Sequence, residues 1–291
     1  MTTDAGRNKA GLKKALILTS VYLVAEAVGG MATGSLALLA DAAHMLTDVG
    51  GLALALLAIS FAERPATPAR TYGYYRAEIL AAVTNAVVLL GVSVLVLVEA
   101  YRRFRAPPEV RTGWMLGIAM VGLAVNAVSL FVLRRHASGS LNVKGAYFEV
   151  LSDFVTSIGV IAGAAIMWAT RWYYTDPIIS AAIGLFIIPR TWILLREGVG
   201  VLLEGTPADV DVEQVRTTIA GVPGVADVHD LHVWSLTSGV NALSAHIVRD
   251  PAVPHETLQG KVRRTIFEAF PIGHVTLQVE SVKCPASETH P

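Results

Sequence analysis

Long apolar stretches fill the first two thirds of the chain. Six of them hold about 20 residues each with few charges, and they cover residues 12–31, 36–61, 77–100, 112–133, 145–169 and 177–195. A helix needs about 20 apolar residues to cross the hydrocarbon core of a bilayer. The pattern therefore predicts a domain of six transmembrane helices over residues 1–200.

The pattern changes after residue 200. Apolar and polar positions alternate over 225–236, 241–250 and 274–281, which predicts three strands, and amphipathic stretches at 209–220 and 255–270 predict two helices. A Ser-Gly pair at 238–239 is a hairpin turn signal. The αββαβ order indicates a ferredoxin-like α+β domain at 204–283 with its helices on one face of a small sheet, followed by a tail at 284–291.

Charge and cysteine content narrow the function classes. The formal net charge is zero, which gives no indication of a nucleic-acid partner, and the single cysteine, Cys284, excludes an intramolecular disulfide. Lys and Arg are more frequent in the segments that face the cytoplasm when the N-terminus lies inside, although the Arg-rich loop at 101–111 runs against this. We therefore expect both termini in the cytoplasm.

Ionisable residues occur in pairs within two of the apolar stretches. The second stretch holds His44 and Asp48, four residues apart, and the fifth holds Glu149 and Asp153 at the same spacing. This spacing places both members of a pair on one helical face. An ionisable group inside a bilayer costs about 2.5 to 3.5 kcal/mol even on the mildest scale, and neither stretch contains a Lys or Arg.

A divalent cation would supply the missing positive charge. Imidazole nitrogen and carboxylate oxygen are ordinary Zn²⁺ ligands, so we predict a transport site at His44, Asp48, Glu149 and Asp153. When the ion leaves, at least one proton should bind to relieve repulsion among the acids, and His44 is its expected carrier. Asp41 lies on the same face and could support the site without binding the ion.

Other interpretations remain open at this point. A single buried His or Asp can be a hydrogen-bonding group between helices. Two other classes of protein could also use these residues: an intramembrane metalloenzyme with water on the metal, or a membrane metal sensor that carries no flux. No separate nucleophile motif supports the enzyme.

Several segments resemble one known family. They are SLALLADAAHMLTD at 35–48, YGYYRAEILAA at 72–82, EVLSDFVTSIGV at 149–160, and the segment from 205 to 239 that ends in VHDLHVWSLTSG. In this order they are similar to the cation diffusion facilitator family, and most similar to its cobalt–zinc–cadmium resistance branch. The resemblance runs from about residue 13 to 280.

This resemblance implies a homodimer that exports divalent metal ions from the cytosol by alternating access, in exchange for protons. We also expect no prosthetic group, and the short loops between the apolar stretches favour a bacterial inner membrane. The family's transport site matches His44, Asp48, Glu149 and Asp153. Many zinc-transporting members have His where this chain has Glu149. We therefore expect the site to accept Co²⁺ or Cd²⁺ as well as Zn²⁺.

Two further groups of residues match family positions. Strand alternation places His232, His246 and Glu280 outside the apolar core of the C-terminal domain, where the family binds metal, although plain surface polarity would give the same pattern. Arg76 and Glu204 match a charge pair that joins the membrane domain to the cytoplasmic one. The alternative is two unpaired charges at the membrane interface.

Overall fold

The structure, a computed structural model, describes residues 4–62, 66–134 and 141–283, and the side chains within helices at 4–16, 18, 47, 48, 51, 52, 54–62, 129–134, 141–150 and 152 lie outside the description. The chain divides into two compact units. The first unit contains residues 1–59 and 84–195, and the second contains residues 60–83 and 196–291. The first residues of the third helix and the last residues of the sixth therefore belong to the second unit.

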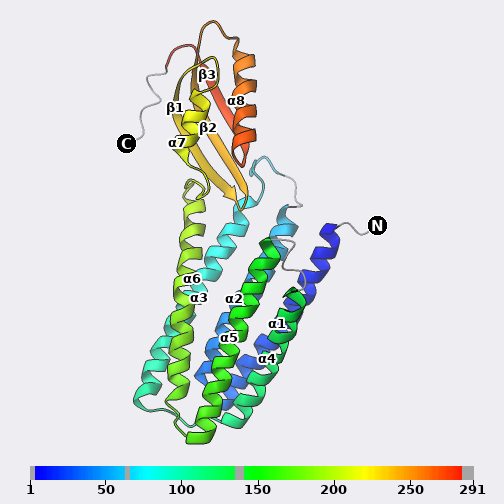
Figure 1. The fold of residues 1–291 in the computed structure, drawn as a ribbon, viewed down its shortest axis with the longest axis vertical. Coiled ribbons are helices and arrows are strands. Elements are labelled where there is room, and N and C mark those ends of the chain that lie inside the picture. The colour runs from blue at the N-terminus through cyan, green and yellow to red at the C-terminus, as the bar shows by residue number, and fades with distance from the viewer. Residues whose placement is uncertain (1–3, 63–65, 135–140, 284–291) are drawn as a thin grey trace. The chain divides into compact units, whose positions relative to one another are not determined.

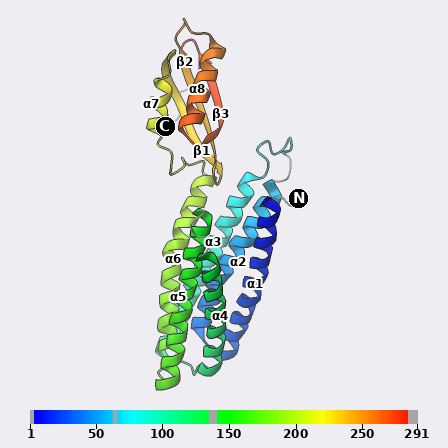
Figure 2. The same cartoon turned by 45° about the vertical axis from the view of Figure 1, so that its right-hand side comes forward.

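A long helix occupies each of the six apolar stretches, and these helices lie alongside one another (Figures 1 and 2). They are α1 Asp4–Thr33, α2 Leu36–Ala62, α3 Tyr75–Arg105, α4 Thr112–Arg134, α5 Leu141–Thr170 and α6 Thr175–Leu202. Most extend beyond the apolar stretch that predicted them, because helices continue into polar residues where they leave the hydrocarbon. The predicted helices are confirmed.

Among the described residues, three helical segments are long and apolar enough to cross a membrane: Tyr75–Arg105, Asp153–Thr170 and Thr175–Leu202. Large apolar side chains on them are exposed, including Leu95 at 67%, Phe186 at 60% and Trp168 at 72%. Exposed apolar surface on this scale is unfavourable in water and matches a hydrocarbon environment.

The start of α2 is fixed by buried Asp176, the second residue of α6. Its carboxylate accepts hydrogen bonds from the Ser35 hydroxyl at 2.7 Å and from the backbone N–H groups of Leu36 and Ala37 at 2.8 and 3.2 Å. A carboxylate here binds orphan N–H groups and lies at the positive end of the helix dipole. Arg103 of α3 lies 3.7 Å from the same carboxylate. Side chains of α3 and α6 therefore fix the position of the start of α2, the helix that carries His44.

The second unit contains the predicted αββαβ domain. Its elements are α7 Val212–Ala220, β1 Val225–Thr237, β2 Val240–Arg249, α8 His255–Ala269 and β3 Ile272–Glu280. The strand order is β1-β2-β3, with β1 and β2 antiparallel and β2 and β3 parallel.

One core joins both helices to one face of this sheet. Ile219 of α7, Leu258 and Ile266 of α8 and Ile247 of β2 are fully buried in it. Each such side chain contributes about 1.5 to 3 kcal/mol by leaving water. The opposite face of the sheet carries polar residues.

A bulge interrupts β1 between two histidines, His229 and His232. His229 lies opposite His246 and His232 lies opposite Ser244, with a register shift between them. Asp230 within the bulge has a φ of 51°. Core residues Val228 and Leu231 are consequently three positions apart instead of two, so side chains on both sides of the bulge reach the polar face.

Candidate metal centres

Helices α2 and α5 bring His44 and Asp153 into direct contact. Nε2 of His44 lies 3.1 Å from Oδ1 of Asp153, and the two side chains are 7% and 17% exposed. Two ligand atoms bound to one tetrahedral Zn²⁺ at about 2.0 Å lie about 3.3 Å apart. The observed spacing therefore suits either a shared proton or a shared metal ion.

The partners of these two residues lie one helical turn away on the same helices. Asp48 follows His44 by four residues within α2, and Glu149 precedes Asp153 by four residues within α5. Their side chains lie outside the described part of the structure. The four-ligand site therefore stays a prediction, and the structure shows one of its contacts, between His44 and Asp153.

Asp41 lies beside this contact. It is 5% exposed, and its carboxylate interacts electrostatically with His44 and Asp153. It also interacts with Glu26 of α1, which is 1% exposed and accepts a hydrogen bond from the Tyr22 hydroxyl at 3.4 Å. The sequence showed a carboxylate in the first apolar stretch, but only the packing of α1 against the site reveals its neighbours.

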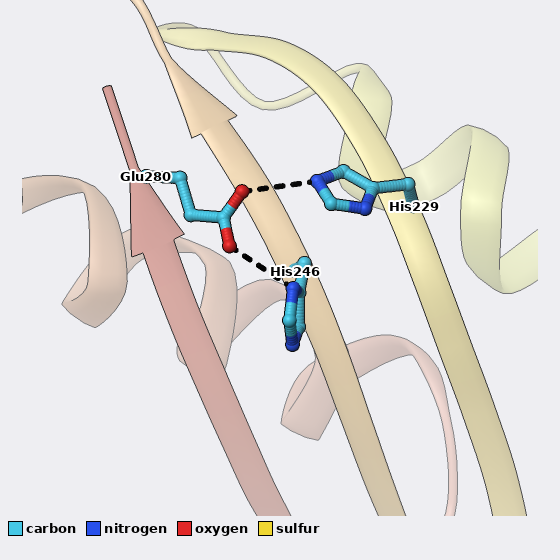
Figure 3. Close-up of side chains that lie close together, drawn as sticks. All are labelled: His229, His246 and Glu280. Atoms are coloured by element: carbon cyan, nitrogen blue, oxygen red, sulfur yellow. Dashed lines mark hydrogen bonds and ion pairs between the residues drawn. The ribbon is translucent and has the colours of Figure 1, made fainter. Parts of the chain in front are cut away.

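A second centre lies on the polar face of the sheet in the second unit (Figure 3). Glu280 of β3 directs one oxygen at Nε2 of His229, 3.2 Å away, and the other at Nδ1 of His246, 3.0 Å away. One ligand atom from each of the three residues lies within 4.8 Å of the others. His229 and Glu280 are 8% and 9% exposed, and His246 is 22% exposed. Two imidazoles and a carboxylate are a suitable donor set for Zn²⁺.

The prediction for this centre differs from the structure in one residue. His246 and Glu280 converge as expected, but His229 joins them in place of His232. Strict alternation along β1 would put residues 229 and 232 on opposite faces of the sheet, and the bulge is what lets His229 share the face of His246. His229 then lies directly opposite His246, whereas His232 is about 48% exposed and binds the Asp230 carboxylate at 3.0 Å.

Asp230 connects the two sets of histidines. Its carboxylate lies 3.0 Å from Nε2 of His232 and 3.5 Å from Nε2 of His246. A left-handed backbone costs about 1 kcal/mol in a non-glycine residue, and Asp is among the few that adopt it. The strained position suits a carboxylate that must reach the outer nitrogen of His246 while Glu280 occupies the inner one.

Comparison with known proteins assigns the chain to a family. Residues 12–203 match the cation efflux transmembrane domain, and residues 207–282 match the cytoplasmic domain of cation efflux proteins. The chain belongs to the cation efflux family. This confirms the resemblance to cation diffusion facilitators and places the protein among multi-pass membrane transporters rather than enzymes.

Several relatives match over almost the whole chain, and three of them illustrate the range. CzcD, a metal cation efflux system protein of Cupriavidus metallidurans, is 49% identical and covers 97% of this chain and 90% of its own. The cadmium, cobalt and zinc/H⁺-K⁺ antiporter of Bacillus subtilis is 39% identical, with coverages of 96% and 91%. The zinc transporter ZitB of Escherichia coli is 37% identical, with coverages of 94% and 88%.

Solved structures also match this cation efflux protein, one of them over part of the chain. It is the metal-bound C-terminal domain of a CzcD transporter, which is 42% identical and covers 24% of this chain and 99% of its own. The TM-score is 0.24.

Arg76 and Glu204 of the cation efflux protein form an ion pair within the second unit. Nη2 of Arg76 lies 2.9 Å from Oε1 of Glu204, and the side chains are 38% and 64% exposed. Glu204 follows α6 with a φ of 61°, and the Gly205 N–H donates to the Gly200 carbonyl at 2.8 Å. This is the Schellman ending of a helix, in which glycine usually takes the left-handed position.

Proposed function

We propose that this cation efflux protein exports divalent metal ions in exchange for protons. Zn²⁺ is its main substrate, and Co²⁺ or Cd²⁺ are additional substrates. The metal ion binds to His44, Asp48, Glu149 and Asp153, between α2 and α5. The observation that carries the proposal is the buried contact between His44 and Asp153, which come from two different helices. The metal-specific and antiporter names of the relatives support it.

Charge explains why protons should replace the metal. Three carboxylates and a neutral imidazole carry a charge of −3, and a divalent ion reduces this to −1. Without the ion, repulsion among the carboxylates raises the proton affinity of the group. A proton on His44 or on a carboxylate therefore competes with the metal, and a pH gradient across the membrane can drive release.

The cytoplasmic domain regulates this cycle in our proposal. Metal at His229, His246 and Glu280 would favour one arrangement of the second unit, and coupling requires that the two transport states bind this metal with different affinity. The Arg76–Glu204 pair joins the start of α3 to the end of α6 and serves as the hinge of that coupling.

The same proposal includes the oligomeric state of the protein and its orientation in the membrane. The protein forms a homodimer in a bacterial inner membrane, residues 1–200 cross it six times, and both termini lie in the cytoplasm. Residues 204–283 then face the metal pool that the protein exports, with 284–291 as a tail.

Zinc-dependent proton flux in proteoliposomes tests the proposal. A pH dye inside the vesicles reports protons while a metal dye reports Zn²⁺. We expect Asp153→Asn to abolish both signals, because it removes a ligand and a negative charge. Glu109→Gln makes the same chemical change at an exposed residue outside the helices and should leave both signals intact. Undiminished zinc and proton flux in Asp153→Asn protein would refute the proposal.

A further inference from the structure

A cavity of about 890 Å³ lies within the second unit, and its lining does not include His229, His246 or Glu280. One wall is the segment 69–76, which ends in the first turn of α3, and the other is β1 at residues 231–234 and 236. Ser244 of β2 also lines it. The proposed regulation uses the Arg76–Glu204 pair in its lining but assigns no ligand to the space itself.

The charged lining of the cavity favours an anion. Arg70 and Arg76 contribute two positive charges and Glu204 contributes one negative charge, which leaves one positive charge in excess. Glu204 already binds Arg76 at 2.9 Å. The Arg70 guanidinium lies 4.6 Å from the centre of the Tyr74 ring, a contact that orients the group, and within residues 66–134 and 141–283 no carboxylate is seen in an ion pair with it.

The aromatic lining is of the kind typical at the level of lipid headgroups. Tyr75 begins α3, and Tyr75–Arg105 is one of the segments apolar enough to span a membrane. Tyr72, Tyr75 and Trp234 line the cavity, and Tyr72 and Tyr75 are 50% and 37% exposed. Tyrosine and tryptophan concentrate at the membrane–water interface, and arginine beside them attracts anionic headgroups.

We propose that this cavity binds the phosphate of an anionic phospholipid of the phosphatidylglycerol type. Arg70 donates to the phosphate in its planar, two-pronged geometry. Tyr72 and Tyr75 surround the glycerol backbone, and the acyl chains leave the cavity along the apolar surface of α3. The binding makes the region around the Arg76–Glu204 pair sensitive to the lipid composition of the membrane.

Lipid titration of the full-length protein in a neutral detergent tests this inference. The probes are dioctanoyl phosphatidylglycerol, dioctanoyl phosphatidylcholine and inorganic phosphate, with binding followed by native mass spectrometry. We expect phosphatidylglycerol to bind wild-type protein roughly tenfold more tightly than Arg70→Gln protein, as expected for loss of a charge-assisted contact. Arg263→Gln removes an exposed arginine from α8, outside the cavity, and should bind like wild type.

Three results would overturn the inference. Equal phosphatidylglycerol affinity in wild-type and Arg70→Gln protein would show that the cavity does not hold the headgroup. An equal loss in Arg263→Gln protein would show that net charge alone attracts the lipid. Binding of inorganic phosphate that prevents lipid binding and depends on Arg70 would identify soluble phosphate as the ligand, against a lipid.

Discussion

Glu204 reaches Arg76 from a backbone conformation that glycine normally adopts. The residue terminates α6 at a φ of 61°, and its carboxylate lies 2.9 Å from the guanidinium at the start of α3. An exposed ion pair contributes less than about 1 kcal/mol, while the left-handed backbone costs a similar amount. The pair therefore adds little to stability, which is consistent with the hinge role that we propose for it.

Glu204→Gly should separate stability from transport. Glycine relieves the backbone strain, so we expect the thermal unfolding midpoint of the full-length protein to stay level or to rise. Transport should fall several-fold if the pair is a hinge. Glu213→Gln breaks a comparable exposed contact with Arg216 on α7 and should leave transport unchanged. A Glu204→Gly protein that transports zinc at the wild-type rate would contradict the hinge role of the Arg76–Glu204 pair.

The cytoplasmic centre gives a prediction that separates two histidines three residues apart. We expect His229→Ala to weaken zinc binding at this centre by at least about a hundredfold, because it removes a direct ligand. His232→Ala should cost about tenfold or less, because His232 binds the Asp230 carboxylate and is not one of the three residues whose ligand atoms converge.

Zinc titration of full-length protein carrying Asp153→Asn measures this difference without the transport site. The two alanine variants are each other's control, since both delete one imidazole from β1. A larger loss in His232→Ala than in His229→Ala would contradict the bulged register of this strand.

The helices and the pairing of their ionisable residues follow from local patterns. Apolar length predicts α1 to α6, and a four-residue spacing puts His44 on the face of Asp48 whatever the rest of the fold does. The regular strand positions of His246 and Glu280 were likewise predicted. These features depend on repeats of 3.6 or 2 residues that the sequence displays directly.

The remainder depends on contacts between distant segments. The bulge at Asp230 adds one residue to β1 and no local pattern marks it, so alternation selected His232 instead of His229. Asp176 is far from Ser35 in sequence, and its hydrogen bonds to the start of α2 form only because α6 lies beside that helix. The cavity beside Arg70 arises from a loop and a strand more than 150 residues apart.

Metal selectivity should respond to residue 149. Glu149→His replaces a carboxylate oxygen with a nitrogen and reduces the negative charge of the site by one. We expect this variant to transport zinc in preference to cobalt more strongly than wild type does, by roughly tenfold or more, because imidazole favours zinc and carboxylates discriminate less. Competition between the two ions in proteoliposomes measures the ratio, and Glu149→Gln controls for the loss of charge.

Proton release on metal binding tests the transport site most directly. Full-length protein with the cytoplasmic centre disabled by His229→Ala and His246→Ala is titrated with Zn²⁺ by calorimetry in buffers of different ionisation enthalpy. We predict that it binds about one Zn²⁺ per chain, releases protons on binding, and loses both properties when His44→Ala and Asp153→Asn are added. Zinc binding without proton release, or binding that survives those two substitutions, would contradict the account.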